Sequence, residues 1–126
     1  MNTNIGLLIL RVVTGIMMLV AHGWPKLSNF SNIANSFADP IGLGPTVSLI
    51  LAIFAEFFCS LAVIVGIKTR IAVIPLIVTM LVAVVIVHGD DPWSKKEFGI
   101  LYLVPFVTLL FTGSGKFSID AFLKKS

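Results

Sequence analysis

Two charged residues, Arg11 and Glu56, lie within long apolar stretches of the sequence. An ionisable side chain inside a bilayer costs about 2.5–3.5 kcal/mol on insertion scales, so such residues normally face the interior of a helix bundle and serve a function. Arg11 lies on the same face of a helix as His22 and Lys26, because steps of three or four residues lead from Arg11 to His22 and then to Lys26. Glu56 has small residues on its own face. We therefore expect both faces to point inward.

The depths of Arg11 and Glu56 allow a buried ion pair between them. At about 1.5 Å per residue, the two residues lie near enough for an arginine side chain to bridge them. Against this pair, each side chain leans toward the N-terminus of its own helix, which separates them if the helices are antiparallel. Without a partner, Glu56 is expected to be protonated, because an unpaired carboxylate is costly in a low dielectric. Both alternatives stay open.

Further polar residues are predicted to meet at one end of the bundle. His22 ends the first apolar run, His88 ends the third, and Glu97 opens the fourth. Lys26 follows His22 by one turn, and Tyr102 inside the fourth run brings a hydroxyl that needs a partner. These residues predict a polar pocket between the helix ends, roofed by the first loop.

Three uses of this pocket are open. The first is quinone binding, in which a histidine donates to a quinone carbonyl and exchanges protons near pH 7, while apolar helices hold the tail. The second is a metal site bound by two histidines and a carboxylate. It is disfavoured because no HxxH or ExxH spacing occurs, and we expect no metal. In the third, both histidines are ordinary helix-end residues that interact favourably with the helix dipole.

The composition is that of a membrane protein. Of the 126 residues, 57% are hydrophobic and 12% are charged, and the mean hydropathy is +1.04. A bilayer core of about 30 Å needs roughly 20 helical residues per crossing. We predict a single transmembrane domain over residues 1–126, with spans at about 5–24, 46–67, 70–88 and 97–113. Short loops make neighbouring helices antiparallel, so the expected fold is an all-α integral membrane four-helix up-down bundle.

The ends of the spans predict further features. The long first loop has apolar residues at helical spacing around Phe30 and Phe37, which indicates a short interfacial helix acting as a lid. After the fourth span, Gly113 and Gly115 are expected to stop the helix, and Ser118 to cap a short interfacial C-terminal helix. The "GSGK" letters do not complete a phosphate-loop pattern, because Phe117 follows the lysine.

The positions of the charged residues predict how the chain is oriented in the membrane. The formal net charge is +3, but the basic residues sit at span ends and not in one patch, so we expect no nucleic-acid partner. With the N-terminus inside, five basic residues are cytoplasmic and three are outside. This bias predicts a multi-pass protein of the cytoplasmic (inner) membrane with both termini in the cytoplasm. The lone Cys59 provides neither a disulfide nor a redox pair.

Several segments together resemble the DoxX family of small bacterial membrane proteins, which is related to the DoxD subunit of thiosulfate:quinone oxidoreductase. The resemblance runs nearly end to end, through "LLILRVVTG", "AHGWPKL", "AEFFCSLAVIVGIKTR", His88, Glu97 and "GSGKFSID". It implies a four-helix bundle in the cytoplasmic membrane, an association with redox chemistry, and a soluble or membrane redox partner protein. The loop after His88, "GDDPWSKK", is more acidic than the resemblance leads us to expect, which indicates a partner surface.

The leading hypothesis is a membrane subunit of an oxidoreductase complex that binds a quinone or a similar apolar redox ligand. In it His22 or His88 donates to the ligand and carries protons, Glu56 is the buried proton acceptor, and Arg11 is its charge partner. The expected ligand-binding residues are Arg11, His22, Lys26, Glu56, His88, Glu97 and Tyr102. The alternative is a non-catalytic membrane adaptor or assembly factor, so whether the chain is itself an enzyme is left open. A transporter is disfavoured because no inverted repeat is evident, although a homo-oligomer would supply the missing bulk.

Overall fold

The computed structural model describes residues 2–125, and every regular element within that range is helical. Met1 and Ser126 lie outside the described residues. The α-helices are interrupted by π-helical turns, labelled η, and the segments follow in this order: α1 (Asn2–Met18), η1 (Leu19–Gly23), α2 (Trp24–Ser28), α3 (Phe30–Ile33), α4 (Pro45–Ile53), η2 (Phe54–Cys59), α5 (Ser60–Val65), α6 (Thr69–Val82), η3 (Ala83–Val87), α7 (Trp93–Thr112) and α8 (Ile119–Lys125).

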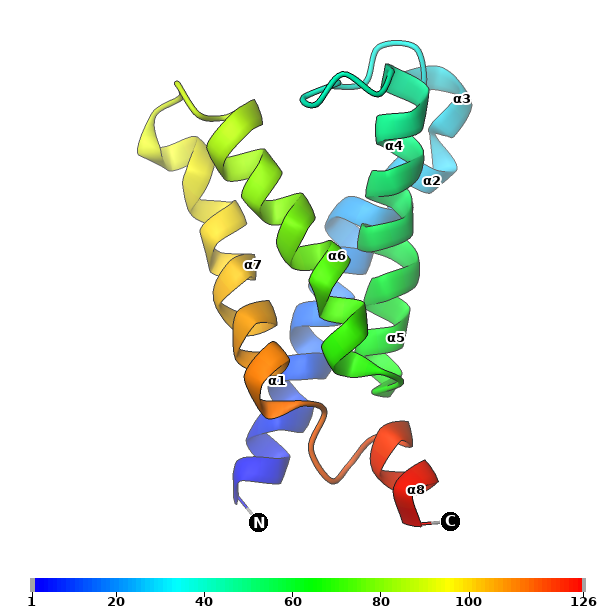
Figure 1. The fold of residues 1–126 in the computed structure, drawn as a ribbon, viewed down its shortest axis with the longest axis vertical. Coiled ribbons are helices and arrows are strands. Elements are labelled where there is room, and N and C mark those ends of the chain that lie inside the picture. Colours follow the sequence, from blue (N-terminus) through cyan, green and yellow to red (C-terminus); the bar gives the residue numbers. More distant parts are fainter. Residues whose placement is uncertain (1, 126) are drawn as a thin grey trace.

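Most segments join end to end into long rods that run alternately up and down, as Figure 1 shows. The rods are α1–η1–α2, α4–η2–α5, α6–η3 and α7. We call the end where α1 begins and α8 lies the terminal end, and the opposite end, with residues 29–44 and 88–92, the loop end. The rods pack most closely as α6 with α7 and as α1 with α5. Toward the loop end these two pairs diverge (Figure 1). The predicted all-α class is confirmed.

Three of the rods are long and apolar enough to cross a membrane: Asn2–Ser28, Pro45–Val65 and Thr69–Val87. They correspond to the first three predicted spans, so the chain is a multi-pass membrane protein. The fourth rod, α7, has 20 residues, but Lys95, Lys96 and Glu97 near its start lower its hydropathy. The fourth crossing, and with it the complete four-helix membrane bundle, stays a prediction.

Local sequence signals set the ends of these helices. Pro45 begins α4, where a missing N–H costs nothing. Gly66 ends α5 in the left-handed conformation, with φ 77°, a region that glycine enters without steric cost. Ser118 caps α8 as predicted, because its hydroxyl accepts the Ala121 N–H at 3.1 Å.

The described core has two parts. The larger part runs along the seam of the rods and includes Met18, Leu76 and Phe106, all fully buried. The smaller part lies under the first loop, where Leu49 and Ile53 of α4 contact Phe30, Ile33 and Phe37 among others. The predicted short helix is therefore present as α3, and its apolar face packs onto α4.

Arg11 connects several segments at the terminal end through hydrogen bonds. Its side chain is 2% exposed, and its guanidinium donates to the carbonyl oxygens of Ser114 at 2.6 Å, Phe117 at 2.8 Å and Ile64 at 3.4 Å. The expected ion pair between Arg11 and Glu56 is therefore wrong. Side chains lean toward their helix N-termini, so Arg11 points toward the terminal end and Glu56, on an antiparallel rod, points toward the loop end.

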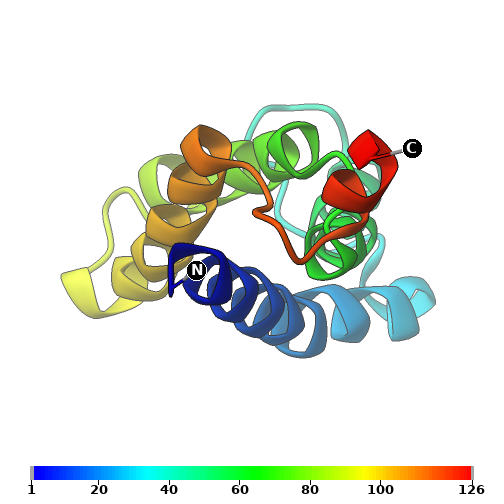
Figure 2. The same cartoon turned by 90° about the horizontal axis from the view of Figure 1, so that it is seen from below.

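Asp120 fastens α8 to the start of α6. Its carboxylate accepts the backbone N–H groups of Lys68 at 2.7 Å and Thr69 at 3.1 Å, and its own N–H donates to the Gly66 carbonyl at 2.9 Å. Burial would raise the pKa of Asp120, but these N–H donors and the Ser114 hydroxyl together hold it below its usual value. Seen from below in Figure 2, the segment after α7 crosses this end to reach α8.

Candidate functional site

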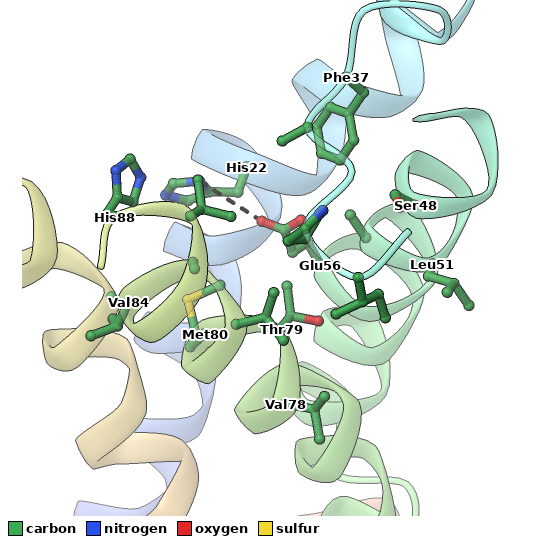
Figure 3. A pocket seen from close by; sticks show the side chains of 18 of the residues that line it. His22, Phe37, Ser48, Leu51, Glu56, Val78, Thr79, Met80, Val84 and His88 are labelled. Atoms are coloured by element: carbon green, nitrogen blue, oxygen red, sulfur yellow. Dashed lines mark ion pairs between the residues drawn. The ribbon is translucent and has the colours of Figure 1, made fainter. Parts of the chain in front are cut away.

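A pocket of about 500 Å³ lies at the loop end, where the two pairs of rods diverge. Its walls come from the ends of every rod and from the first loop (Figure 3). The apolar part of the lining includes Leu51, Val78, Met80, Val84 and Phe98. The polar part is smaller and consists of His22, Lys26, Ser48, Glu56, Thr79, His88, Lys95 and Tyr102. A largely apolar cavity with a few placed polar groups is typical of a small-molecule site.

Glu56 is the centre of the polar part. Its side chain is 3% exposed, and its Oε1 accepts from Lys26 Nζ at 2.8 Å. The Nδ1 atom of His22 lies 3.9 Å from the same oxygen, the contact drawn in Figure 3. A lysine and a histidine from the first rod thus meet one buried carboxylate from the second. Lys26, and not Arg11, is the charge partner of Glu56.

The first two rods approach closely at this point because of Gly23. A Cβ atom at Gly23 would overlap the backbone carbonyl of Glu56, so only glycine allows the contact. Both residues lie in π-helical turns, η1 and η2, and η3 faces the same pocket through Ala83, Val84 and Val87. Single π-helical turns inside α-helices occur often at functional sites.

Tyr102 extends the polar wall onto α7. It is 8% exposed, and its ring meets the His22 ring edge to face, with centroids 5.4 Å apart and planes at 89°. On its other side it stacks on Phe106, with centroids 6.2 Å apart. Edge-to-face contact is a favoured aromatic geometry, so Tyr102 orients the imidazole of His22.

His88 also lines the pocket, at the end of the third rod. Its Nδ1 is 2.7 Å from Asp91 Oδ2, three residues further along the chain. This hydrogen bond is the main reason that the pKa of Asp91 lies below its usual value. Asp91 was not predicted to belong to the site, although the spacing of three residues is a recognisable signal for such a pair.

The predicted set of site residues is only partly brought together. His22, Lys26, Glu56, His88 and Tyr102 line the pocket, whereas Arg11 and Glu97 do not.

Glu97 is exposed on α7. The inward stripe of this helix passes through Lys95, Phe98 and Tyr102, which share one face at helical spacing, and Glu97 falls outside that face. The sequence showed where this helix begins, but not which of its residues face the pocket.

The first loop covers the pocket, as the sequence predicted. Phe37, Pro40 and Ile41 are among its lining residues. Asp39 pins the loop to the start of α4, because its carboxylate accepts the Gly44 N–H at 3.0 Å and the Ser48 hydroxyl at 2.9 Å. This contact between the loop and Ser48 was missed, because helical spacing places Ser48 on the face of Glu56 but does not show which loop residue meets it.

Within residues 2–125, no three or more His, Cys, Asp and Glu side chains are grouped so that they could hold a metal ion. The two histidines belong to separate polar contacts, one with Glu56 and one with Asp91.

Comparisons with known proteins extend these observations. The chain is 32% identical over 123 residues to a protein of Bacillus subtilis named "Putative oxidoreductase CatD", covering 97% of this chain and 90% of the relative. It is 27% identical over 107 residues to an "Uncharacterized protein" of Haemophilus influenzae, covering 81% of this chain and 71% of that protein. No solved structure is significantly similar to the chain. The DoxX family model matches residues 6–89, which include His22, Lys26, Glu56 and His88, and the chain therefore belongs to the DoxX family.

Proposed function

We propose that this chain is the membrane subunit of an oxidoreductase and that its pocket binds a quinone or a similar apolar redox ligand. The observation that carries the proposal is the buried Glu56, paired with Lys26 and adjacent to His22, in the wall of an otherwise apolar pocket. The Bacillus subtilis relative that matches 97% of this chain is named "Putative oxidoreductase CatD", which supports the redox class.

The pocket suits a ligand of this kind in size and chemistry. Its volume of about 500 Å³ lies within the range of about 300–1,000 Å³ typical of small-molecule sites. Apolar walls from α4, α6 and α7 suit an aromatic head group and the start of an apolar tail. The polar groups are concentrated on His22, Lys26 and Glu56, where a carbonyl oxygen of the ligand would find donors.

The side chains have separate roles in this proposal. A quinone, when bound, supplies an acceptor for two electrons and two protons. His22 donates a hydrogen bond to a carbonyl oxygen and passes its proton to that oxygen when the ligand is reduced. Glu56, 3.9 Å from His22, takes up a proton from the aqueous side and returns it to His22, and Lys26 holds the Glu56 carboxylate in place between these transfers. Tyr102 keeps the His22 ring in place, and His88 offers a second donor in the pocket lining.

In this proposal a partner protein supplies the electrons. The acidic turn after the third rod, with Asp90 and Asp91, is the proposed partner surface. Lys68, Arg70, Lys116 and Lys124 lie at the terminal end, and this bias favours a cytoplasmic terminal end in the inner membrane.

The test measures the ligand directly. The full chain is purified from native membranes in mild detergent, and its organic extract is analysed by mass spectrometry. We expect about one quinone per chain in the wild type and a loss of at least tenfold in a His22→Ala, His88→Ala double variant. A tenfold loss corresponds to about 1.4 kcal/mol, less than the two hydrogen bonds to the ligand contribute together.

A matched pair of variants tests the pocket itself. Val78 lines the pocket and Val85, on the same rod, does not, while both are exposed, at 52% and 65%. Val78→Trp should displace the quinone and Val85→Trp should leave it bound. Extracts of the wild type no richer in quinone than the surrounding lipid would contradict the proposal and favour the adaptor role.

A further inference from the structure

A second hollow, of about 600 Å³, lies at the terminal end between the start of α6, the end of α7 and α8. Four basic side chains line it, from three separate segments of the chain: Lys68, Arg70, Lys116 and Lys124. Among the described residues, Asp120 is the one acidic residue in its lining. The positive-inside rule accounts for basic residues at this end, but it does not require them to surround one hollow.

The charge of this hollow is not neutralised within the part of the chain that the structure describes. None of its four cations takes part in a described ion pair. The carboxylate of Asp120 is already engaged by the backbone N–H groups of Lys68 and Thr69 and by the Ser114 hydroxyl. The side-chain cations therefore keep a capacity for an anion from outside the chain.

Arg70 is held in a position from which it can bind such an anion. Its Nη2 donates to the Phe111 carbonyl at 3.2 Å, and its guanidinium lies against the backbone of Gly113, where an added Cβ would be only 3.4 Å from it. A guanidinium has five N–H donors, so one bond to the backbone leaves others for a ligand. Planar guanidinium groups bind phosphate oxygens well, often in pairs.

One exposed apolar side chain lies in the lining of the hollow, and two more belong to residues next to lining residues in the sequence. Ile71, in its lining, is 64% exposed, Phe111 at the end of α7 is 77% exposed, and Phe122 on α8 is 72% exposed. The hollow also lies where the second candidate span ends, at Val65, and the third begins, at Thr69. Cations beside exposed apolar groups at a span end fit an amphiphile with an anionic head and apolar tails.

We propose that this hollow binds the phosphate head group of an anionic phospholipid, with its acyl chains against Ile71 and Phe111. Lys116 and Lys124 attract the head group, and Arg70 bonds its phosphate oxygens. The bound lipid bridges α8 to the ends of α6 and α7, and so reinforces the contacts of Asp120. This site is separate from the loop-end pocket and does not depend on the redox proposal.

Native mass spectrometry of the full chain in detergent, titrated with phosphatidylglycerol and separately with phosphatidylcholine, tests the site. We expect the wild type to bind phosphatidylglycerol at least tenfold more tightly. Removing one juxtamembrane lysine weakens binding to anionic lipid by about fivefold, so the Lys116→Gln, Lys124→Gln variant should lose about 30-fold. Both side chains are exposed, so the fold should survive, and circular dichroism with thermal unfolding checks this.

Two controls keep the result specific. The Lys95→Gln, Lys96→Gln variant removes the same charge at the loop end and should retain the preference for phosphatidylglycerol. Lys116→Arg, Lys124→Arg should retain it as well, which separates loss of charge from loss of fold.

Equal binding of the two lipids by the wild type, or equal binding of phosphatidylglycerol by the wild type and the glutamine variant, would overturn the proposal. Inorganic phosphate that displaces phosphatidylglycerol at equal concentration would also overturn it, in favour of a site for free phosphate.

Discussion

Breaking the ion pair between Lys26 and Glu56 should destabilise the protein well beyond the effect of a surface pair. At the 2.8 Å separation of Nζ and Oε1 and an effective dielectric of about 20, the attraction is about 6 kcal/mol before desolvation is counted. Removing one member of a buried pair costs about 3–5 kcal/mol. The Lys26 side chain keeps 21% of its exposure, so we expect the lower end, about 3 kcal/mol, for Glu56→Gln.

The double variant Lys26→Met, Glu56→Met should be much less destabilised than the sum of its single variants, because it leaves no unpaired charge. A double-mutant cycle should therefore give a coupling energy of at least about 2 kcal/mol. The cycle also separates the two functional hypotheses. If the pair only holds the rods together, restoring stability in the double variant restores function, whereas the proposed redox role predicts that quinone binding stays lost.

The assay is reversible unfolding in mixed micelles with increasing SDS, followed by circular dichroism for all four proteins of the cycle. Ser60→Ala is the matched control, since Ser60 is buried on the next segment, α5, and its hydroxyl has no hydrogen-bond partner among the described residues. Its variant should be nearly as stable as the wild type. A coupling energy below about 0.5 kcal/mol, the value of an exposed pair, would refute the reasoning.

Three further predictions concern other contacts. Gly23→Ala should destabilise the protein by about 1–3 kcal/mol, because the new Cβ would press on the Glu56 carbonyl. Gly6→Ala should not, since that position is open, and equal thermal unfolding of the two variants would contradict the close approach. Arg11→Met should lose about 3 kcal/mol and expose the segment after α7 to protease, while quinone content stays unchanged. A loss of quinone there would place Arg11 in the site after all. Asp120 stabilises the fold through a folded-state pKa below its usual value near 3.8. Its contribution should be full above that value and fall away only as the pH drops toward the folded-state pKa. The unfolding temperatures of the wild type and Asp120→Asn should become equal only at strongly acidic pH. Equal unfolding temperatures already at pH 6 would rule out the stabilising contacts of the Asp120 carboxylate.

Much of the architecture was accessible from hydropathy and local signals. Long apolar runs, prolines at helix starts and glycines at helix ends report directly on backbone conformation, which is why the first three spans and the Ser118 cap were predicted. The fourth span lies at the limit of these signals, because charged residues share its first turns.

The sequence predicted which residues belong to the candidate site better than it predicted which of them pair. The inward stripe of the first rod correctly grouped His22 and Lys26, but Arg11 lies on the same stripe and faces the other end of the molecule. Glu56 packs against Gly23, so along the helix axis it is much nearer to Lys26, three residues further on, than to Arg11, twelve residues back. The direction in which side chains lean also brings Lys26 and Glu56 together. The orientation of α7 required knowledge of its packing, so Glu97 was placed in the pocket and Lys95 was not.

The three π-helical turns have a consequence for how this sequence tolerates insertions and deletions. A π turn closes a hydrogen bond one residue further along than an α turn does, so each of η1, η2 and η3 holds a residue that a regular α-helix would not accommodate. Deleting one residue from such a turn would let the rod become a continuous α-helix, and the segments on either side would keep nearly the same alignment, because the wide turn only absorbs the extra residue. For η1 (Leu19–Gly23) this change would leave Lys26 facing Glu56, but it would alter the positions of the residues inside the turn, His22 and Gly23 among them. Relatives that differ by a single residue in these turns can therefore share the fold and the ion pair of this chain, and yet present a different side chain beside Glu56.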